Sequence, residues 1–152
     1  MLNRNKKPNQ GLWNGVGGKL EPGESPIECV LREIAEETDL QLLSNQIECR
    51  GQVTWYWLPA EGGSPIFQGG MYLYAGDIPD GVSCVTPRRT VEGILEFKDT
   101  AWLLSEDNHG VVSNIREFLP RLFDSSPIAE YRCYYILSGG RYLLSNTEVH
   151  YM

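Results

Sequence analysis

The chain has 152 residues, a length that fits a single domain with its own hydrophobic core. Hydrophobic residues make up 41% and charged residues 22% of it, which is typical of globular proteins, and no apolar run approaches the roughly 20 residues that span a bilayer. The 20 acidic against 13 basic residues give a net charge of −7, which argues against duplex nucleic acid and anionic membranes as partners.

The four cysteines are scattered along the chain and form no C-x-x-C pair. This spacing indicates neither a zinc site nor a disulfide framework and is typical of reduced thiols in a cytosol. The basic segment Met1–Lys7 is followed by no apolar core, so it lacks the pattern of a secretory signal peptide. These features together predict a cytoplasmic protein.

The first predicted element is a helix over residues 25–40, which follows a stretch at 1–17 that is rich in loop-forming residues. Ser25 and Glu28 have the spacing of a capping box, and Pro26 occupies the first helical position. One face of the helix carries apolar residues at the spacing i, i+3, i+4 and i+7, namely Ile27, Val30, Leu31 and Ile34.

Alternating apolar residues between turn signals predict strands farther along the chain. The expected strands cover residues 49–58, 70–76 and 92–98 and a terminal hairpin of 131–136 and 142–144 around a Ser-Gly-Gly turn. A second helix is expected to begin near Ser113. Its inner side carries Ile115, Phe118, Leu119 and Leu122. This order of elements predicts a layered domain that mixes helices with sheet.

The polar face of the first helix is unusually acidic. Glu33, Glu36 and Glu37 stand at i, i+3 and i+4, where like charges repel by a few tenths of a kcal/mol per pair. One interpretation is a solvated surface helix in which Arg32 relieves the repulsion. The other is a site for a hard cation, because clustered carboxylates and a free backbone carbonyl are the ligands that Mg²⁺ or Mn²⁺ prefers.

The segment before this helix favours the second interpretation, because its glycines let the backbone turn sharply and approach a ligand. From Gly18 the sequence reads G-x5-E-x7-R-E-I-A-E-E-T-D-L, which closely resembles the Nudix box, G-x5-E-x7-R-E-U-x-E-E-x-G-U, where U is bulky and aliphatic. The matching positions are Gly18, Glu24, Arg32, Glu33, Ile34, Glu36, Glu37 and Leu40. Asp39 replaces a glycine at the helix end, where we expect left-handed geometry, a small stability cost and intact chemistry.

The resemblance implies a Nudix-type α/β/α sandwich around a mixed β-sheet, with residues 1–152 as one domain, and Mg²⁺-dependent hydrolysis of a nucleoside diphosphate linked to another group. Bound cations would offset the charge of the pyrophosphate in a chain that otherwise repels it. The metal positions that it implies are the Gly18 carbonyl with Glu33, Glu36 and Glu37, and Glu92 as an additional carboxylate unless it is an exposed loop acid. Glu36 or Glu33 would activate the attacking water, and Arg32 and Glu24 would orient these groups.

The W-N-G-x-G-G-K run before the helix resembles MutT-type Nudix enzymes that hydrolyse oxidised purine triphosphates such as 8-oxo-dGTP. The resemblance implies that Asn14 contacts the purine, and the alternative is a turn residue beside the next glycine. Lys19 is expected to meet phosphate, and Arg4 either faces the nucleotide or belongs to an exposed basic loop. Trp102 is either a core residue or part of the base pocket. The Trp-Pro-Asp-Asp cluster of the mammalian type is absent.

The expected reaction converts a (deoxy)nucleoside triphosphate to a monophosphate and pyrophosphate. Alternatives are ADP-ribose, a dinucleotide polyphosphate or 5′-triphosphate RNA as substrate, or a non-catalytic Nudix module that binds nucleotides. Nudix domains normally have a strand and part of a second before the glycine-rich loop, and only Met1–Arg4, resembling the end of the second, is present. Because a missing first strand exposes a sheet edge, we expect poor stability as a monomer or a homodimer that covers the gap.

Overall fold

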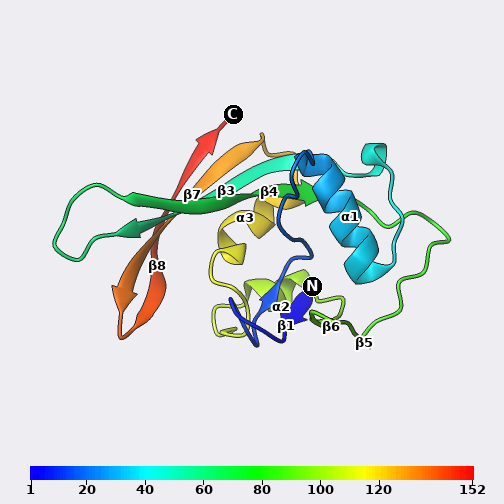
Figure 1. Ribbon diagram of the computed structural model, residues 1–152, viewed down its shortest axis with the longest axis horizontal. Coiled ribbons are helices and arrows are strands. Elements are labelled where there is room, and N and C mark those ends of the chain that lie inside the picture. Colours follow the sequence, from blue (N-terminus) through cyan, green and yellow to red (C-terminus); the bar gives the residue numbers. More distant parts are fainter. The chain divides into compact units, whose positions relative to one another are not determined.

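The computed structural model describes residues 1–152, which form two compact units. The first unit comprises Met1–Glu48 and Gly76–Ile115, and the second comprises Cys49–Ala75 and Arg116–Met152. The elements of Figure 1 are, in chain order, β1 (Leu2–Arg4), β2 (Trp13–Asn14), α1 (Pro26–Thr38), the short 3₁₀ helix Ser44–Gln46, β3 (Glu48–Leu58), β4 (Ile66–Ala75), β5 (Arg88–Arg89), β6 (Gly93–Leu95), α2 (Thr100–Leu104), α3 (Ile115–Leu122), β7 (Ala129–Ser138) and β8 (Arg141–Tyr151).

The first unit contains a sheet of four short strands in the order β2-β1-β6-β5. Its pairs are antiparallel, and Leu2 in β1 lies opposite Asn14 in β2 and Leu95 in β6. The Leu2 side chain is only 2% exposed, so the start of the chain contributes to the core of this unit. The interpretation of Met1–Arg4 as part of a strand is confirmed, whereas the loop-rich stretch at 1–17 also contains β2.

Helix α1 begins and ends close to the residues that the sequence predicted. At its start, the Glu28 carboxylate accepts a hydrogen bond from the Ser25 backbone N–H at 2.8 Å, and the Ser25 hydroxyl accepts one from the Glu28 N–H, which completes the predicted capping box. At its end, Asp39 has φ 60° and its N–H donates to the Ala35 carbonyl at 3.0 Å. The left-handed geometry expected at Asp39 is therefore confirmed.

The second unit contains a mixed sheet in the order β4-β3-β7-β8. Strands β3 and β7 are parallel, β7 and β8 are antiparallel, and Val53 lies opposite Tyr131 with both side chains buried. Phe118 of α3 packs edge-on against the Tyr131 ring, with the ring centroids 6.2 Å apart. The predicted terminal hairpin is confirmed as the pair β7 and β8, longer than expected (Figure 1).

Along β3, apolar residues alternate as predicted, and their exposure increases toward an aromatic residue near the end of the strand. Val53 is fully buried, whereas Trp57, on the same face of the strand, is 38% exposed. The Trp57 ring stacks on Tyr142 of β8, with the ring centroids 4.4 Å apart and the planes inclined by 7°. Aromatic stacking thus extends the side-chain packing on this face of β3 beyond its fully buried residues.

One short helix, α2, was not expected from the sequence. The Asp99 carboxylate caps it by accepting from the N–H groups of Ala101 and Trp102. Leu103 of α2 is buried, but Trp102 is 42% exposed, so the interpretation of Trp102 as a core residue is wrong. Helix α3 buries Ile115, Phe118 and Leu119 as predicted.

The fold class is mixed α/β, with few helices and with its strands divided between two sheets. None of the helices is both long and apolar enough to cross a bilayer. The predicted site residues all belong to the first unit.

Candidate functional site

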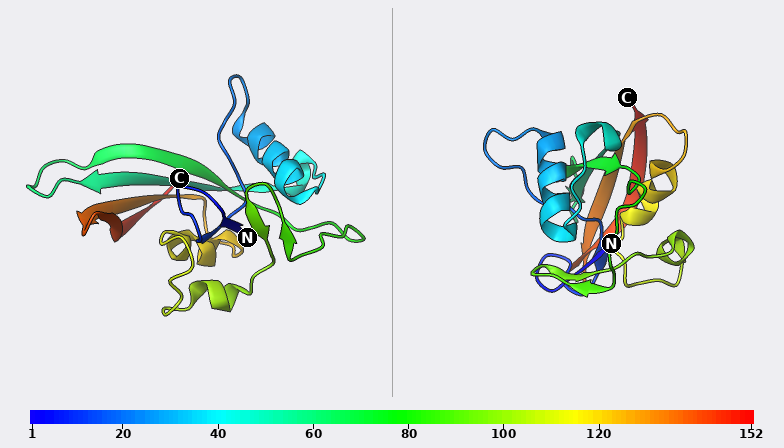
Figure 2. Two further views of the ribbon diagram at one scale, coloured as in Figure 1. Left: turned by 60° about the horizontal axis from the view of Figure 1, so that its bottom comes forward. Right: turned by 90° about the vertical axis from the view of Figure 1, so that its right-hand side faces the viewer.

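The loop between β2 and α1 brings the backbone of two glycines against the acidic helix; Figure 2 shows the chain passing through this loop before it enters α1. At Gly18, a β-carbon would overlap the end of the Glu33 side chain, so any side chain at this position would displace the Glu33 carboxylate. Gly17 adopts φ 152°, a value that other residues rarely reach, and its N–H donates to the Glu37 carboxylate at 3.2 Å. The loop conformation thus favours glycine at position 17, and the place of the Glu33 carboxylate depends on the absence of a side chain at Gly18.

Arg32 joins this loop to the helix. Its guanidinium forms two parallel hydrogen bonds to the Glu24 carboxylate, at 2.8 and 3.0 Å, and a third to the Lys19 carbonyl at 3.2 Å. It also donates to the carboxylates of Glu33 at 2.7 Å and Glu36 at 3.4 Å. The Arg32 hydrogen bonds hold the pKa of Glu24 at about 2. Arg32 and Glu24 therefore have the contacts expected of orienting residues.

Glu37 is the most buried carboxylate of the acidic face, with 7% of the residue exposed. Burial raises the pKa of Glu37 to about 7, and the negative charges of Glu33 and Glu92 act in the same direction. The hydrogen bond from Gly17 and the charge of Arg4 oppose this increase. A carboxylate in this environment favours either a proton or a cation close to it.

Glu92 lies between β5 and β6 and forms ion pairs with two basic residues of the N-terminal segment. Its carboxylate is 2.6 Å from Lys6 Nζ and 3.8 Å from Arg4 Nη2. The Nε of Arg4 is buried without a hydrogen-bond partner. The structure thus brings Arg4 and Glu92 together near Glu37, and it adds Lys6, which the sequence did not single out.

The carboxylates of the acidic face suit a hard cation by their chemistry but are not gathered around one point. No group of three Asp, Glu, His or Cys side chains lies in an arrangement that could hold a metal ion. The Glu36 side chain is 62% exposed, while Glu33 lies against Gly18 and Glu37 is buried beside Gly17. The oxygen ligands and the close approach at Gly18 fit Mg²⁺ or Mn²⁺, and Glu36 is the group that has to turn toward the other two.

Asn14 and Lys19, the residues expected to contact substrate, occupy the two ends of the glycine loop. The Asn14 side-chain oxygen accepts from the Gly15 N–H at 2.9 Å, and Asn14 is the last residue of β2. The Lys19 residue is exposed, and its backbone carbonyl belongs to the Arg32 network. The Asn14 amide keeps a second lone pair on its oxygen besides its NH₂ group, so it can still both accept and donate hydrogen bonds.

Sequence reasoning missed Arg88, which lies in the two-residue strand β5. Its guanidinium forms an ion pair with the Asp39 carboxylate and donates to the Glu37 backbone carbonyl at 2.9 Å. These partners lie 49 and 51 residues away along the chain, so no local pattern indicates the contact.

Sequence reasoning also missed the position of Lys98. Its ammonium lies 4.2 Å from the ring centroid of Trp13 and 5.2 Å from that of Trp102, and it pairs with Glu96 at 2.7 Å. Trp13 directly precedes Asn14, so this cation–π cluster stabilises the start of the glycine loop.

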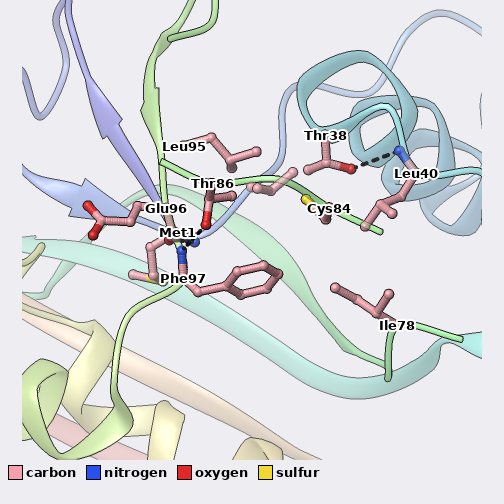
Figure 3. Close-up of a pocket in the computed structure, with 10 residues that line it drawn as sticks. Met1, Thr38, Leu40, Ile78, Cys84, Thr86, Leu95, Glu96 and Phe97 are labelled. Carbon is pink, nitrogen blue, oxygen red and sulfur yellow. Dashed lines mark hydrogen bonds between the residues drawn. The ribbon is translucent and has the colours of Figure 1, made fainter. Parts of the chain in front are cut away.

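Figure 3 shows a separate pocket of about 110 Å³ in the first unit. It lies at the end of α1, where the Leu40 N–H donates to the Thr38 hydroxyl at 3.2 Å, and its other walls include Cys84, Thr86 and Phe97. None of the predicted site residues lines it. The acidic face and the glycine loop are thus distinct from this pocket.

Comparisons with known proteins show similarity to one family. Over a short segment the chain is similar to a protein of Bacillus subtilis (strain 168) described as "Uncharacterized Nudix hydrolase YvcI", with 42% identity over 43 residues. That alignment covers 28% of this chain and 27% of the relative, so the chain spans about a quarter of its relative's length. The NUDIX domain pattern matches residues 1–120, which include both the glycine loop and the acidic helix. The chain therefore belongs to the NUDIX domain family.

Proposed function

We propose that the chain is a Mg²⁺- or Mn²⁺-dependent hydrolase that cleaves a (deoxy)nucleoside triphosphate to a nucleoside monophosphate and pyrophosphate. The preferred substrate in this proposal is an oxidised purine nucleotide such as 8-oxo-dGTP. Family membership supports the general reaction, the hydrolysis of a nucleoside diphosphate linked to another group. The choice of an oxidised purine rests on the W-N-G-x-G-G-K run that begins at Trp13.

The observation that carries the proposal is the packing of carboxylates against the glycine loop. The Glu33 carboxylate occupies the space that a β-carbon of Gly18 would need, and the Glu37 carboxylate is buried beside Gly17. One buried and one partly buried negative charge in contact with one loop destabilise a protein unless a cation compensates for them. Arg32 compensates in part at Glu33, and Glu37 has no comparable ion pair among its contacts described above.

The Gly18 carbonyl and the carboxylates of Glu33, Glu36 and Glu37, with Glu92 as a further carboxylate, would hold the ion. A bound Mg²⁺ supplies positive charge that polarises phosphoryl oxygens and offsets charge on the leaving pyrophosphate.

The chain's other groups act on the water and the substrate. Glu36 or Glu33 orients the attacking water and accepts its proton, and Arg32 keeps Glu33 in place. Lys19 and Arg4 bring positive charge toward the phosphates, and the Asn14 amide contacts the purine. In this assignment the exposed Glu36 is the group with freedom to rotate onto a water molecule.

Hydrolysis of a panel of nucleotides with Mg²⁺, followed by chromatographic separation of the products, tests the proposal. The panel comprises 8-oxo-dGTP, unmodified dGTP, ADP-ribose, a dinucleotide polyphosphate and 5′-triphosphate RNA. We expect 8-oxo-dGTP to give the highest kcat/KM, and Glu36→Gln or Glu33→Gln to lower kcat by about 100-fold or more. Glu61→Gln, which removes an equal charge from an exposed loop, serves as the matched control and retains full activity.

The other outcomes separate the alternatives. Preferential cleavage of ADP-ribose, the dinucleotide or the RNA refutes the oxidised purine as substrate and retains a Nudix hydrolase. Binding of nucleotides without cleavage of any refutes catalysis and identifies a nucleotide-binding module.

A further inference from the structure

The C-terminal end of α1 is fastened by contacts that reach its last carbonyl groups. The Thr38 hydroxyl donates to the Ile34 carbonyl at 2.6 Å, and the Asp39 N–H donates to the Ala35 carbonyl at 3.0 Å. Helix α1 ends at Thr38, so no N–H group of the helix lies far enough along the chain to donate to the Glu37 carbonyl. Arg88 donates to this carbonyl instead, at 2.9 Å. An arginine at this end also interacts favourably with the negative end of the helix dipole.

Glu37 is consequently held at two places. Its carboxylate accepts from the Gly17 N–H, in the loop that follows β2, and its carbonyl accepts from Arg88, in β5. Strands β2 and β5 are the two edges of one sheet, in the order β2-β1-β6-β5. The backbone of this residue is therefore tied to one edge strand of the sheet, and its side chain is tied to the loop that follows the other edge strand.

The second partner of Arg88 explains how the chain accommodates Asp39 in place of the glycine of the Nudix box. Asp39 has φ 60°, a conformation that glycine adopts freely and that other residues adopt at a cost. Its carboxylate points to Arg88 and forms an ion pair with it. One guanidinium thus contacts both the left-handed residue and the carbonyl of Glu37, and its fork geometry suits two acceptors at once.

We propose that Arg88 is a positioning residue that fixes Glu37 for metal binding through its hydrogen bond to the Glu37 carbonyl. The inference rests on the proposed function, because it assigns Glu37 to the metal site. Arg88 does not touch the substrate. Its effect is to keep the end of α1 at a constant place relative to Gly17 and Gly18.

Four variants separate this role from a general effect on stability. Arg88→Ala removes both contacts, and Arg88→Lys keeps the charge but reaches only one of the two acceptors. Asp39→Gly removes the ion pair, supplies a residue suited to left-handed geometry and leaves the Glu37 carbonyl within reach of Arg88. Arg89→Ala, which changes the exposed neighbour in the same strand, is the matched control.

Binding of Mn²⁺ to the nucleotide-free chain, followed by electron paramagnetic resonance of the free ion, is the main measurement. We expect Arg88→Ala to raise the Mn²⁺ dissociation constant about tenfold or more, as outer contacts of metal ligands typically do, and Arg88→Lys to restore part of the affinity. Asp39→Gly and Arg89→Ala should bind as the unchanged chain does. Amide hydrogen exchange without metal should accelerate at Asp39 and Leu40 in Arg88→Ala alone.

Unchanged Mn²⁺ affinity in Arg88→Ala overturns the inference, and so does an equal loss in Asp39→Gly, because the ion pair would then carry the effect. Should Arg88→Ala fail to fold, Arg88→Lys decides: affinity below that of the unchanged chain supports the inference, and equal affinity overturns it. If the chain without any substitution binds no Mn²⁺, the proposed function itself is refuted. Measurements on the Arg88 variants alone cannot give that result.

Discussion

Replacement of Glu37 by glutamine should make the metal-free chain more stable above pH 7 and have little effect below pH 4.5. Burial raises the pKa of Glu37 from an ordinary value of 4.5 to about 7, so the folded chain binds a proton that the unfolded chain has already released. The free energy of unfolding therefore falls as the pH rises through this window. The difference between the two pKa values corresponds to about 3 kcal/mol of the free energy of unfolding. This contribution is present below pH 4.5 and is fully lost above pH 7.

Glutamine preserves the acceptor for the Gly17 N–H and removes the titration. Urea unfolding with EDTA at pH 4 and at pH 8.5 measures the effect, since the difference between the chain and its Glu37→Gln variant cancels all other titrating groups. Glu36→Gln removes an equal charge at a side chain that is 62% exposed and should change stability by less than about 0.5 kcal/mol at either pH. If the Glu37→Gln and unchanged chains lose stability in parallel between the two pH values, the pKa of Glu37 is not raised and the reasoning from burial is wrong.

Three further changes test the local structure of the site. Gly18→Ala places a β-carbon against the end of the Glu33 side chain, so this carboxylate has to move and Mn²⁺ binding should weaken while circular dichroism still shows a folded chain. Unchanged Mn²⁺ binding would contradict this role of Gly18. Arg32→Lys replaces the two parallel hydrogen bonds to Glu24 with one and should lower kcat about tenfold with little change in KM, which steady-state kinetics can check. Ser25→Ala removes the cap of α1 and should cost about 1 kcal/mol in urea unfolding, and Ser25→Asp should restore it.

Helix α1 and the terminal hairpin could be predicted because their signals lie within a few residues of each other. Ser25 and Glu28 specify the start of α1 by a hydrogen-bond pattern that needs no distant partner. The pair Gly139 and Gly140 supplies the two positive φ values that the turn between β7 and β8 requires. Local chemistry of this kind is independent of the rest of the fold.

Strands β2 and β5 of the first sheet, and the pairing of that sheet, could not be predicted, because strands this short show no period. β2 and β5 have two residues each, and their pairing depends on β1 and β6, which come from distant parts of the chain. The role of Arg88 depends on the same pairing, since only the sheet brings β5 to the end of α1. Contacts between such distant residues leave no pattern in a single sequence.

The Nudix box indicated which carboxylates matter but not how they differ. Glu36 and Glu37 are adjacent in sequence, and about 100° of helix rotation separates their side chains. This rotation leaves Glu36 exposed and buries Glu37 against Gly17. The difference in pKa follows from burial, which becomes visible only when the packing of the loop is known.

The tryptophans give each compact unit a spectroscopic reporter of its own. Two of the four, Trp13 and Trp102, lie in the first unit and share the ammonium of Lys98, while Trp55 and Trp57 lie in the second. Indole emission responds to nearby charge and to solvent, so a chain that retains only one pair of tryptophans fluoresces from one unit alone. Loss of the cation near Trp13 changes the emission next to the glycine loop, which makes this part of the molecule visible without any added label.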